Sequence, residues 1–259
     1  MNPITQSDKA LKWLLVPFLL FTVSSCIPTY YMANSGMDAI VFTTPVYRDS
    51  AQVTSYMGGK FTHSVDSSFH RSNETNLFGQ VYWFRTHTDK YYNFSYGAFG
   101  YYGEYHVSAV QEYRGKKGYF GGGLSSEYSW NIPLGFADFR VFGLKGTLYY
   151  EDGDYRKFKI LAGEQKLAQV STDLFGFNIS ETMELDIKLN KVSSIGLFIS
   201  NGISGQLISG ERFYTSSGIL NFQTNKFMLY IQGSSTLLHG VSDLFGINEE
   251  LSIGLNFRL

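Results

Sequence analysis

The chain has 259 residues, with 21 Lys or Arg against 22 Asp or Glu, which gives a formal net charge of −1. This balance supplies neither a basic field nor a long charge run, so the composition argues against a nucleic-acid partner. Aromatic residues make up 17% of the chain, and 27 Gly stand against 5 Pro, a content typical of pleated sheet with tight bends and of the aromatic belts of membrane barrels.

The first 25 residues have the layout of a secretory signal. Lys9 and Lys12 precede a short apolar run, residues 13–21, whereas a spanning helix needs about 20 apolar residues. Small residues then lead to Cys26, the only cysteine, which cannot form an internal disulfide. The alternative is a buried free thiol that follows a core helix.

The tetrapeptide Val23-Ser24-Ser25-Cys26 resembles the lipobox of bacterial lipoproteins. The resemblance implies that residues 1–25 are a signal peptide removed by cleavage before Cys26. It also implies a covalent diacylglycerol and an N-acyl lipid such as palmitate on Cys26, and we expect no other cofactor.

Residues 26–50 form an irregular segment in this interpretation. Pro28, Pro45 and the turn-like Asn34-Ser35-Gly36 interrupt any regular pattern. The short apolar stretch 39–42 could be a strand or a plug-like segment. A single β-barrel domain is then expected over residues 51–259.

Period-two alternation recurs through that domain and is clearest over residues 182–190. The apolar residues of this stretch are Met183, Leu185, Ile187 and Leu189, and the polar ones are Thr182, Glu184, Asp186 and Lys188. One apolar and one polar face is typical of a strand. About ten strands are expected, with one or two more possible near Ala39 and Tyr155. A short helix is the alternative over residues 155–168.

The expected fold class is all-β, an antiparallel up-and-down membrane β-barrel of about 10–12 strands. Several strands are longer than usual for a soluble protein, and Tyr pairs cluster near strand ends. The closing residues Phe257-Arg258-Leu259 resemble the C-terminal strand of outer-membrane barrels, which implies contact with the barrel-assembly machinery. Alternation alone does not give the direction of the apolar face, so a soluble lipid-tethered barrel that binds a hydrophobic ligand remains an alternative.

The overall layout also resembles uncharacterised outer-membrane barrel lipoproteins of Bacteroidota. The resemblance rests on residues 26–31, 56–59 and the closing strand. It implies a bacterial outer-membrane location with contacts to membrane lipid. No acidic residue follows Cys26 directly, which implies a lipid in the periplasmic leaflet.

Motifs for chemistry are lacking. The five histidines have no metal-ligand spacing, no Gly-x-Ser-x-Gly motif is present, and Gly121-Gly122-Gly123 lacks a P-loop lysine. We therefore expect no catalytic residue, no metal site and no enzymatic activity.

The best candidate site is a set of charges predicted to face the lumen: Glu184, Asp186, Lys188 and Arg258. One interpretation is an internal ion-pair network, with Arg140 or Arg258, that fills a narrow barrel; the other is a polar conduit. Arg140 and Lys145 fall on opposite parities of their predicted strand. The leading functional hypothesis is a structural or accessory subunit of an envelope complex with a protein partner, and the alternative is a small channel for hydrophilic or amphipathic solutes.

Overall fold

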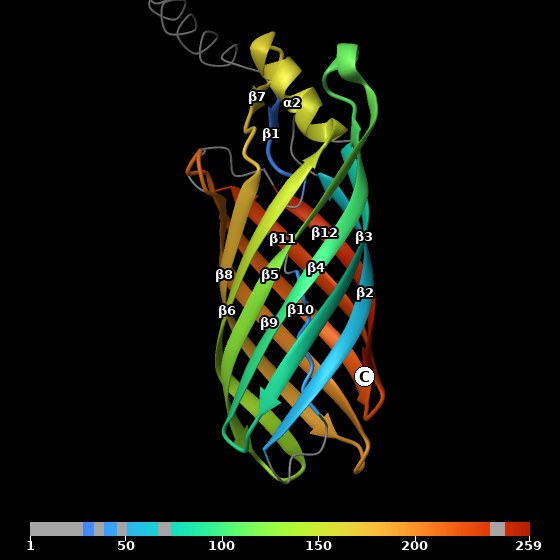
Figure 1. Cartoon of the computed structure of the whole chain (residues 1–259), viewed down its shortest axis with the longest axis vertical. Helices are drawn as coiled ribbons and strands as arrows, with labels where there is room; N and C mark the ends of the chain where they lie inside the picture. The colour runs from blue at the N-terminus through green and yellow to red at the C-terminus, as the bar shows by residue number, and fades with distance from the viewer. Residues whose placement is uncertain (1–27, 34–38, 46–50, 67–73, 239–246) are drawn as a thin grey trace, which may run out of the picture.

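A computed structural model describes residues 28–33, 39–45, 51–66, 74–238 and 247–259, and shows a closed antiparallel barrel (Figure 1). Its strands are hydrogen-bonded in the order β10-β11-β12-β2-β3-β4-β5-β6-β8-β9. Their bounds are β2 Gln52–Asp66, β3 Glu74–Thr88, β4 Tyr92–Val107, β5 Gly115–Pro133, β6 Ala137–Gly153, β8 Phe175–Lys188, β9 Ser193–Gln206, β10 Arg212–Thr224, β11 Phe227–Leu238 and β12 Ile247–Arg258. The first and last of these, β2 and β12, pair with each other and close the ring.

The apolar faces of the strands point outward. Outward-facing aliphatic side chains are exposed, and six of them are between 54% and 69% exposed: Val81, Leu124, Leu148, Ile179, Leu220 and Ile253. The alternate positions point inward and carry buried polar groups, for example Gln80, Lys145, Asn178, Asn221, Gln232 and Asn256. Apolar outside and polar inside is the arrangement of a membrane β-barrel. It contradicts the soluble ligand-binding alternative, which requires the apolar faces to point inward.

The two ends of the barrel differ. Short turns and the C-terminus lie at one end, here called the turn end, and the longer connections lie at the other, the loop end (Figure 1). The loop end carries helix α2 (Asp154–Glu164), the short helix η2 (Gln111–Tyr113), and a two-stranded parallel sheet of β1 (Thr29–Tyr30) and β7 (Gln169–Val170). Of the two alternatives near Tyr155, a further strand or a short helix, the helix is the one observed.

Helix α2 follows β6 without a loop. Gly153, at the junction, has a φ of +130°, a conformation that L side chains rarely adopt. Tyr155, Phe158 and Ala162 of α2 are buried toward the barrel. In the part of the chain that the structure describes, no helix is long and apolar enough to cross a membrane.

One correction concerns β6. Arg140 and Lys145 have opposite parities in sequence, yet they are 3% and 1% exposed and both lie inside the barrel. The register with β8 shifts between Arg140 and Gly143, so Val141 and Phe142 are both exposed in succession. This β-bulge adds one residue to β6, so the residues of the strand that precede it face the opposite side from the one that strict alternation predicts.

Aromatic side chains fill much of the interior. A buried cluster extends from the loop end into the barrel and includes Phe42, Tyr56, Phe78, Phe84, Tyr101, Tyr105, Tyr119 and Tyr155. The Tyr pairs expected at the membrane interfaces therefore divide: Tyr102 is 64% exposed, while its neighbour Tyr101 is 5% exposed. Ten strands enclose a narrow lumen that side chains can fill, and here they do so together with part of the N-terminal segment.

Candidate functional site: a threaded lumen

Residues 39–45, here called the lumen strap, run inside the barrel and are all buried. They form no strand, so of the two expectations for residues 39–42 the plug-like segment is the one observed. Inward side chains of four strands donate hydrogen bonds to strap oxygens. The donor and acceptor residues are Gln80 to Ala39, Lys145 to Ile40, Asn256 to Val41, Thr86 to Thr43 and Gln223 to Thr44.

These contacts satisfy five main-chain carbonyl groups of the strap. An extended segment inside a barrel cannot use sheet partners, and an unpaired buried carbonyl costs about 1–3 kcal/mol. Gln80 reaches the oxygen of Ala39 at 2.6 Å, and Asn256 Nδ2 reaches that of Val41 at 3.1 Å. The barrel therefore fixes the path of the strap mainly through its carbonyl groups.

Asn256 lies at the centre of a second set of contacts. Its Nδ2 also donates to Thr43 Oγ1 at 2.8 Å, and its Oδ1 accepts from the hydroxyl of Tyr82. The hydroxyls of Tyr82 and Tyr230 are 2.8 Å apart. The strap is thus tied to β3, β11 and β12 through one amide side chain.

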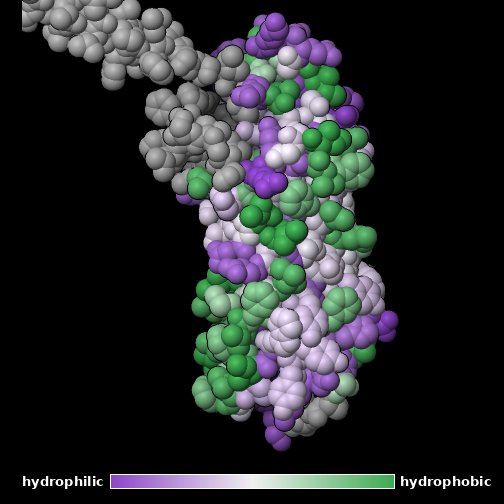
Figure 2. All heavy atoms as spheres, turned by 90° about the vertical axis from the view of Figure 1, so that its left-hand side faces the viewer, coloured by the Kyte–Doolittle hydropathy of each residue, from purple (hydrophilic) through white to green (hydrophobic). Residues whose placement is uncertain are grey.

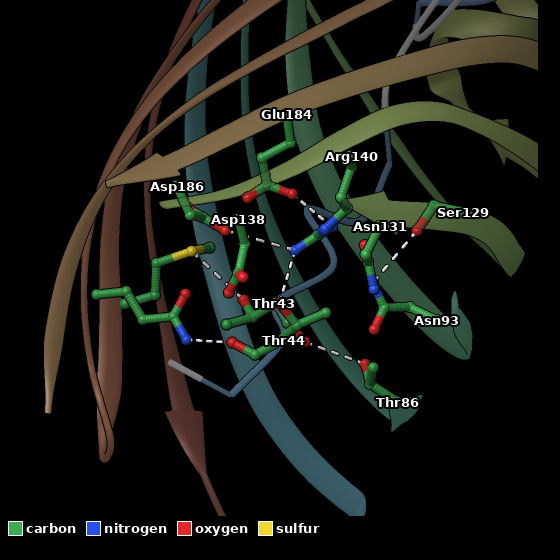
Figure 3. A network of polar contacts seen from close by, with 12 residues as sticks. Thr43, Thr44, Thr86, Asn93, Ser129, Asn131, Asp138, Arg140, Glu184 and Asp186 are labelled. Atoms are coloured by element: carbon green, nitrogen blue, oxygen red, sulfur yellow. Dashed lines mark hydrogen bonds and ion pairs between the residues drawn. The ribbon is translucent and has the colours of Figure 1, made fainter. Parts of the chain in front are cut away.

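The charges predicted from β8 converge on Arg140 (Figure 3). Glu184 and Asp186, both buried, form ion pairs with its guanidinium, and Arg140 Nη2 donates to Thr44 Oγ1 at 2.7 Å. The β-bulge of β6 brings Arg140 to this position. The acidic pair therefore holds the cation that in turn holds the strap, and this part of the site is an internal ion-pair network.

The other two predicted lumen charges lie nearer the turn end. Lys188, at the end of β8, pairs with Asp138 at 3.2 Å and is partly exposed. Arg258, at the end of β12, is exposed and is no part of the buried set. It shares the inward parity of Asn256, but its strand ends at the rim, so the closed lumen does not cover its side chain.

The loop end is closed by buried ionisable groups. Glu74 accepts from the hydroxyls of Tyr30 and Tyr105 at 2.7 and 3.0 Å and from the main-chain N–H groups of Ser108 and Ala109. Glu151 accepts from the N–H of Ala33 at 2.8 Å. Two carboxylates therefore fasten residues 28–33 over the barrel mouth.

Lys159 of α2 completes this closure. Its ammonium group donates to the oxygen of Tyr31 at 3.1 Å and lies 5.1 Å from the ring centre of Tyr155. Burial lowers the pKa of Lys159 to about 8, against the opposing effect of Glu151. The helix thus holds the N-terminal segment through a lysine that is costly to keep charged.

Residues Gln80, Gln223 and Asn256 were missed as functional candidates from the sequence. The sequence does contain an indication of their role. Each residue has the inward parity of its strand and carries a side-chain amide, which can donate a hydrogen bond to a carbonyl without adding charge. Cys26 lies outside the described residues. Within the described ranges, no group of three or more His, Cys, Asp or Glu side chains is placed to hold a metal ion.

No protein-family model matches the chain, and no curated protein matches it. Similar solved structures include an outer membrane channel from Pseudomonas putida, at 10% identity over 85% of this chain and 100% of that chain, with a TM-score of 0.47. The beta domain of the Bordetella autotransporter BrkA aligns at 9% identity over 82% of this chain and 100% of that chain, TM-score 0.45. The outer membrane protein OprG from Pseudomonas aeruginosa aligns at 10% identity over 82% and 99%, TM-score 0.37. These values are too low to indicate a shared activity.

Proposed function

We propose that this protein is a lipid-anchored, non-enzymatic and non-conducting β-barrel of the bacterial outer membrane, which acts as a structural or accessory subunit of an envelope complex. One observation carries the proposal: the lumen strap occupies the barrel and is bonded to strands around its circumference. A lumen fixed in this way supports a role other than transport.

Two features support a firm hold on the membrane. The outward apolar face suits a spanning barrel, and the lipobox-like string ending at Cys26 suits a lipid anchor. Two independent anchors fix both the depth and the position of a subunit. Insertion by the barrel-assembly machinery fits the closing strand, whose alternation continues through Phe257.

The path of the strap bears on which leaflet holds the lipid. Pro28, whose main-chain oxygen accepts a hydrogen bond from Gln169 of β7, lies at the loop end, and Cys26 stands two residues before it in the sequence. Membrane barrels usually place short turns in the periplasm and longer loops outside. A lipid in the periplasmic leaflet, as the sequence suggested, therefore requires the opposite orientation; the usual orientation favours the outer leaflet. Protease accessibility of a tag inserted after Arg114, beside η2 at the loop end, distinguishes the two.

The test of the accessory role is extraction of the full chain from its native membrane in a mild detergent, followed by native gel electrophoresis. We expect a discrete complex larger than the 29.3 kDa chain, which converts to the single chain when the detergent is made denaturing. Migration as a lone chain with no stoichiometric companion contradicts the proposal.

The second candidate is a channel that opens when the strap leaves. The observation that favours it is the polarity of the strap's partners: Lys145, Gln80 and Gln223 would line the vacated space. Planar-bilayer recordings of the intact chain should show no conductance steps. A variant in which residues 39–45 are replaced by a Gly-Ser segment of equal length tests the capacity to conduct, and steps from the intact chain would favour the channel.

A further inference from the structure

We propose that the outward face of β8 to β12 docks a different integral membrane protein, which presents basic side chains to Glu181 and Glu249. The inference deepens the accessory role proposed above and rests on it. Its basis is a band of five polar residues, here called the polar band, on neighbouring strands of the lipid-facing surface: Glu181, Asn201, Ser216, Ser235 and Glu249.

Strand register places these residues side by side. Glu181 pairs with Asn201, Asn201 with Ser216, Ser216 with Ser235, and Ser235 with Glu249. All five are exposed on the outside of the barrel. Ser216 Oγ donates to Asn201 Oδ1 at 2.9 Å, so the band is one continuous polar surface.

Apolar rows enclose the band on both sides. The next outward positions toward the turn end include Met183, Ile199 and Leu251, and those toward the loop end include Ile179, Ile203, Tyr214 and Leu237. A hydrophilic patch at mid-height, with hydrophobic side chains above and below, is visible on the side shown in Figure 2. The band is therefore set within the apolar surface.

Its depth follows from strand geometry. At roughly 3.3 Å per residue and a tilt of about 40°, Glu181 lies about 20 Å along the barrel axis from Leu189 at the turn end. The apolar band of a membrane barrel is about 25 Å tall. The carboxylate of Glu181 thus falls where lipid tails would otherwise contact it, and an ionisable group at that depth calls for a partner.

The chain itself supplies no such partner. Among the described residues, neither Glu181 nor Glu249 forms an ion pair. A shallow groove of about 590 Å³ runs along the band and is lined by Glu181, Asn201, Ser216, Ser235, Ile203 and Leu237. Exposed carboxylates and hydrogen-bonding groups in an apolar frame suit a protein surface with one or two Lys or Arg side chains.

A second copy of this chain fits poorly. In a two-fold contact centred on Ser216, each copy would present the same polar band with its carboxylates to the other. Neither copy then supplies the positive charge that a carboxylate requires in a medium of low dielectric constant. Charge complementarity therefore selects a basic partner.

The experiment is photo-crosslinking of the full chain in the bacterium that produces it. A photoreactive amino acid replaces Ser216, and in the control chain it replaces Ala98, an exposed outward residue of β4 on the opposite side of the barrel. We expect one discrete protein adduct from position 216 and none from position 98. The double variant Glu181→Lys, Glu249→Lys should reduce the adduct about tenfold or more, since opposed charges become like charges. The variant Glu181→Gln, Glu249→Gln, which folds more readily in lipid, should give an intermediate yield.

Barrel folding is checked in every variant by the change of gel mobility on boiling. If the lysine variant fails this check, the glutamine variant decides alone: an undiminished adduct overturns the inference. An adduct at a multiple of the chain's own mass, an adduct to lipid alone, or equal adducts at both positions also overturns it. In each of these cases a complex that still co-purifies leaves the accessory role standing, whereas loss of the complex itself removes both.

Discussion

Gln80 on β3 and Ala39 in the strap are joined by a hydrogen bond of 2.6 Å, in which the side-chain amide donates to the main-chain oxygen. The acceptor is a main-chain carbonyl, which every amino acid has, so this hydrogen bond does not depend on the side chain at position 39. The bonds from Asn256 to Val41 and from Lys145 to Ile40 are of the same kind. The lumen therefore specifies the conformation of the strap more strictly than the identity of its side chains, and changes to the donors should matter more than changes to the strap.

Asn256→Leu tests this dependence. The substitution leaves the oxygen of Val41 and the hydroxyls of Thr43 and Tyr82 without their amide partner, so we expect the free energy of unfolding to fall by about 1–3 kcal/mol per buried group left unpaired. Urea unfolding in detergent, followed by gel mobility, measures it. The control is Leu255→Ala on the outward side of the same strand; an equal loss from both variants would show that the strap contacts do not matter.

Arg140→Leu should be more damaging. It leaves Glu184 and Asp186 buried without their cation, and breaking a buried ion pair from one side costs about 3–5 kcal/mol. The same unfolding measurement applies. Lys188→Leu, which breaks the partly exposed pair with Asp138, should cost about 1 kcal/mol.

A compensating variant separates charge from packing in the Arg140 site. Adding Glu184→Gln and Asp186→Asn to Arg140→Leu removes the uncompensated charges, so much of the lost stability should return. If the triple variant is no more stable than Arg140→Leu, the loss comes from packing rather than from the buried carboxylates.

Glycines on the two faces of neighbouring strands give a matched pair. A Cβ at Gly202, on the lumen side of β9, would collide with the main-chain oxygen of Ile179 and with Ser180, so Gly202→Val should destabilise the barrel by about 3 kcal/mol. A Cβ at Gly218, on the outward side of β10, meets nothing within 4 Å, and Gly218→Val should be neutral or gain up to about 1 kcal/mol. Equal effects on the unfolding midpoint would mean that the lumen is loosely packed.

The lowered pKa of Lys159, at the loop end, predicts that the free energy of unfolding depends on pH. Its pKa falls from 10.5 to about 8 on folding, so between these values the unfolded chain binds more protons than the folded one. Stability should therefore rise as the pH rises from about 8 to 10.5, by about 3 kcal/mol at most, and stay flat below 8. Other groups titrate in this range, so the quantity to measure is the wild-type unfolding midpoint minus that of Lys159→Met. A difference that does not change with pH contradicts the assignment.

The strands were largely predictable because their alternation is local. Residues 182–190 separate apolar from polar positions without exception, and β8 ends within this stretch at Lys188. The direction of the faces was not predictable, because alternation is identical whether the apolar side meets lipid or a core. The closed ring and the exposure of Leu185 settle the direction.

The candidate site was predictable only in part. Glu184 and Asp186 were identified from parity. Their partner Arg140 points into the lumen because of a β-bulge, and no residue type in the sequence indicates where that bulge lies. The strap bonds join residues as far apart as Val41 and Asn256, and no periodic pattern links such positions. Inward aromatic residues such as Tyr101 also look the same in sequence as outward ones at a membrane interface.

Closure of the ring by β2 and β12 has a mechanical consequence for the strap. The chain passes through the lumen and then enters β2, so the ring around it is completed by the first and the last barrel strands. Once β2 and β12 have paired, the closed ring of strands surrounds the strap, which cannot leave sideways. Its removal requires either reopening of this pairing or pulling residues 28–33 through a filled interior. Retention of the strap is thus a matter of kinetics as well as of bonding, and brief fluctuations of the barrel would not release it.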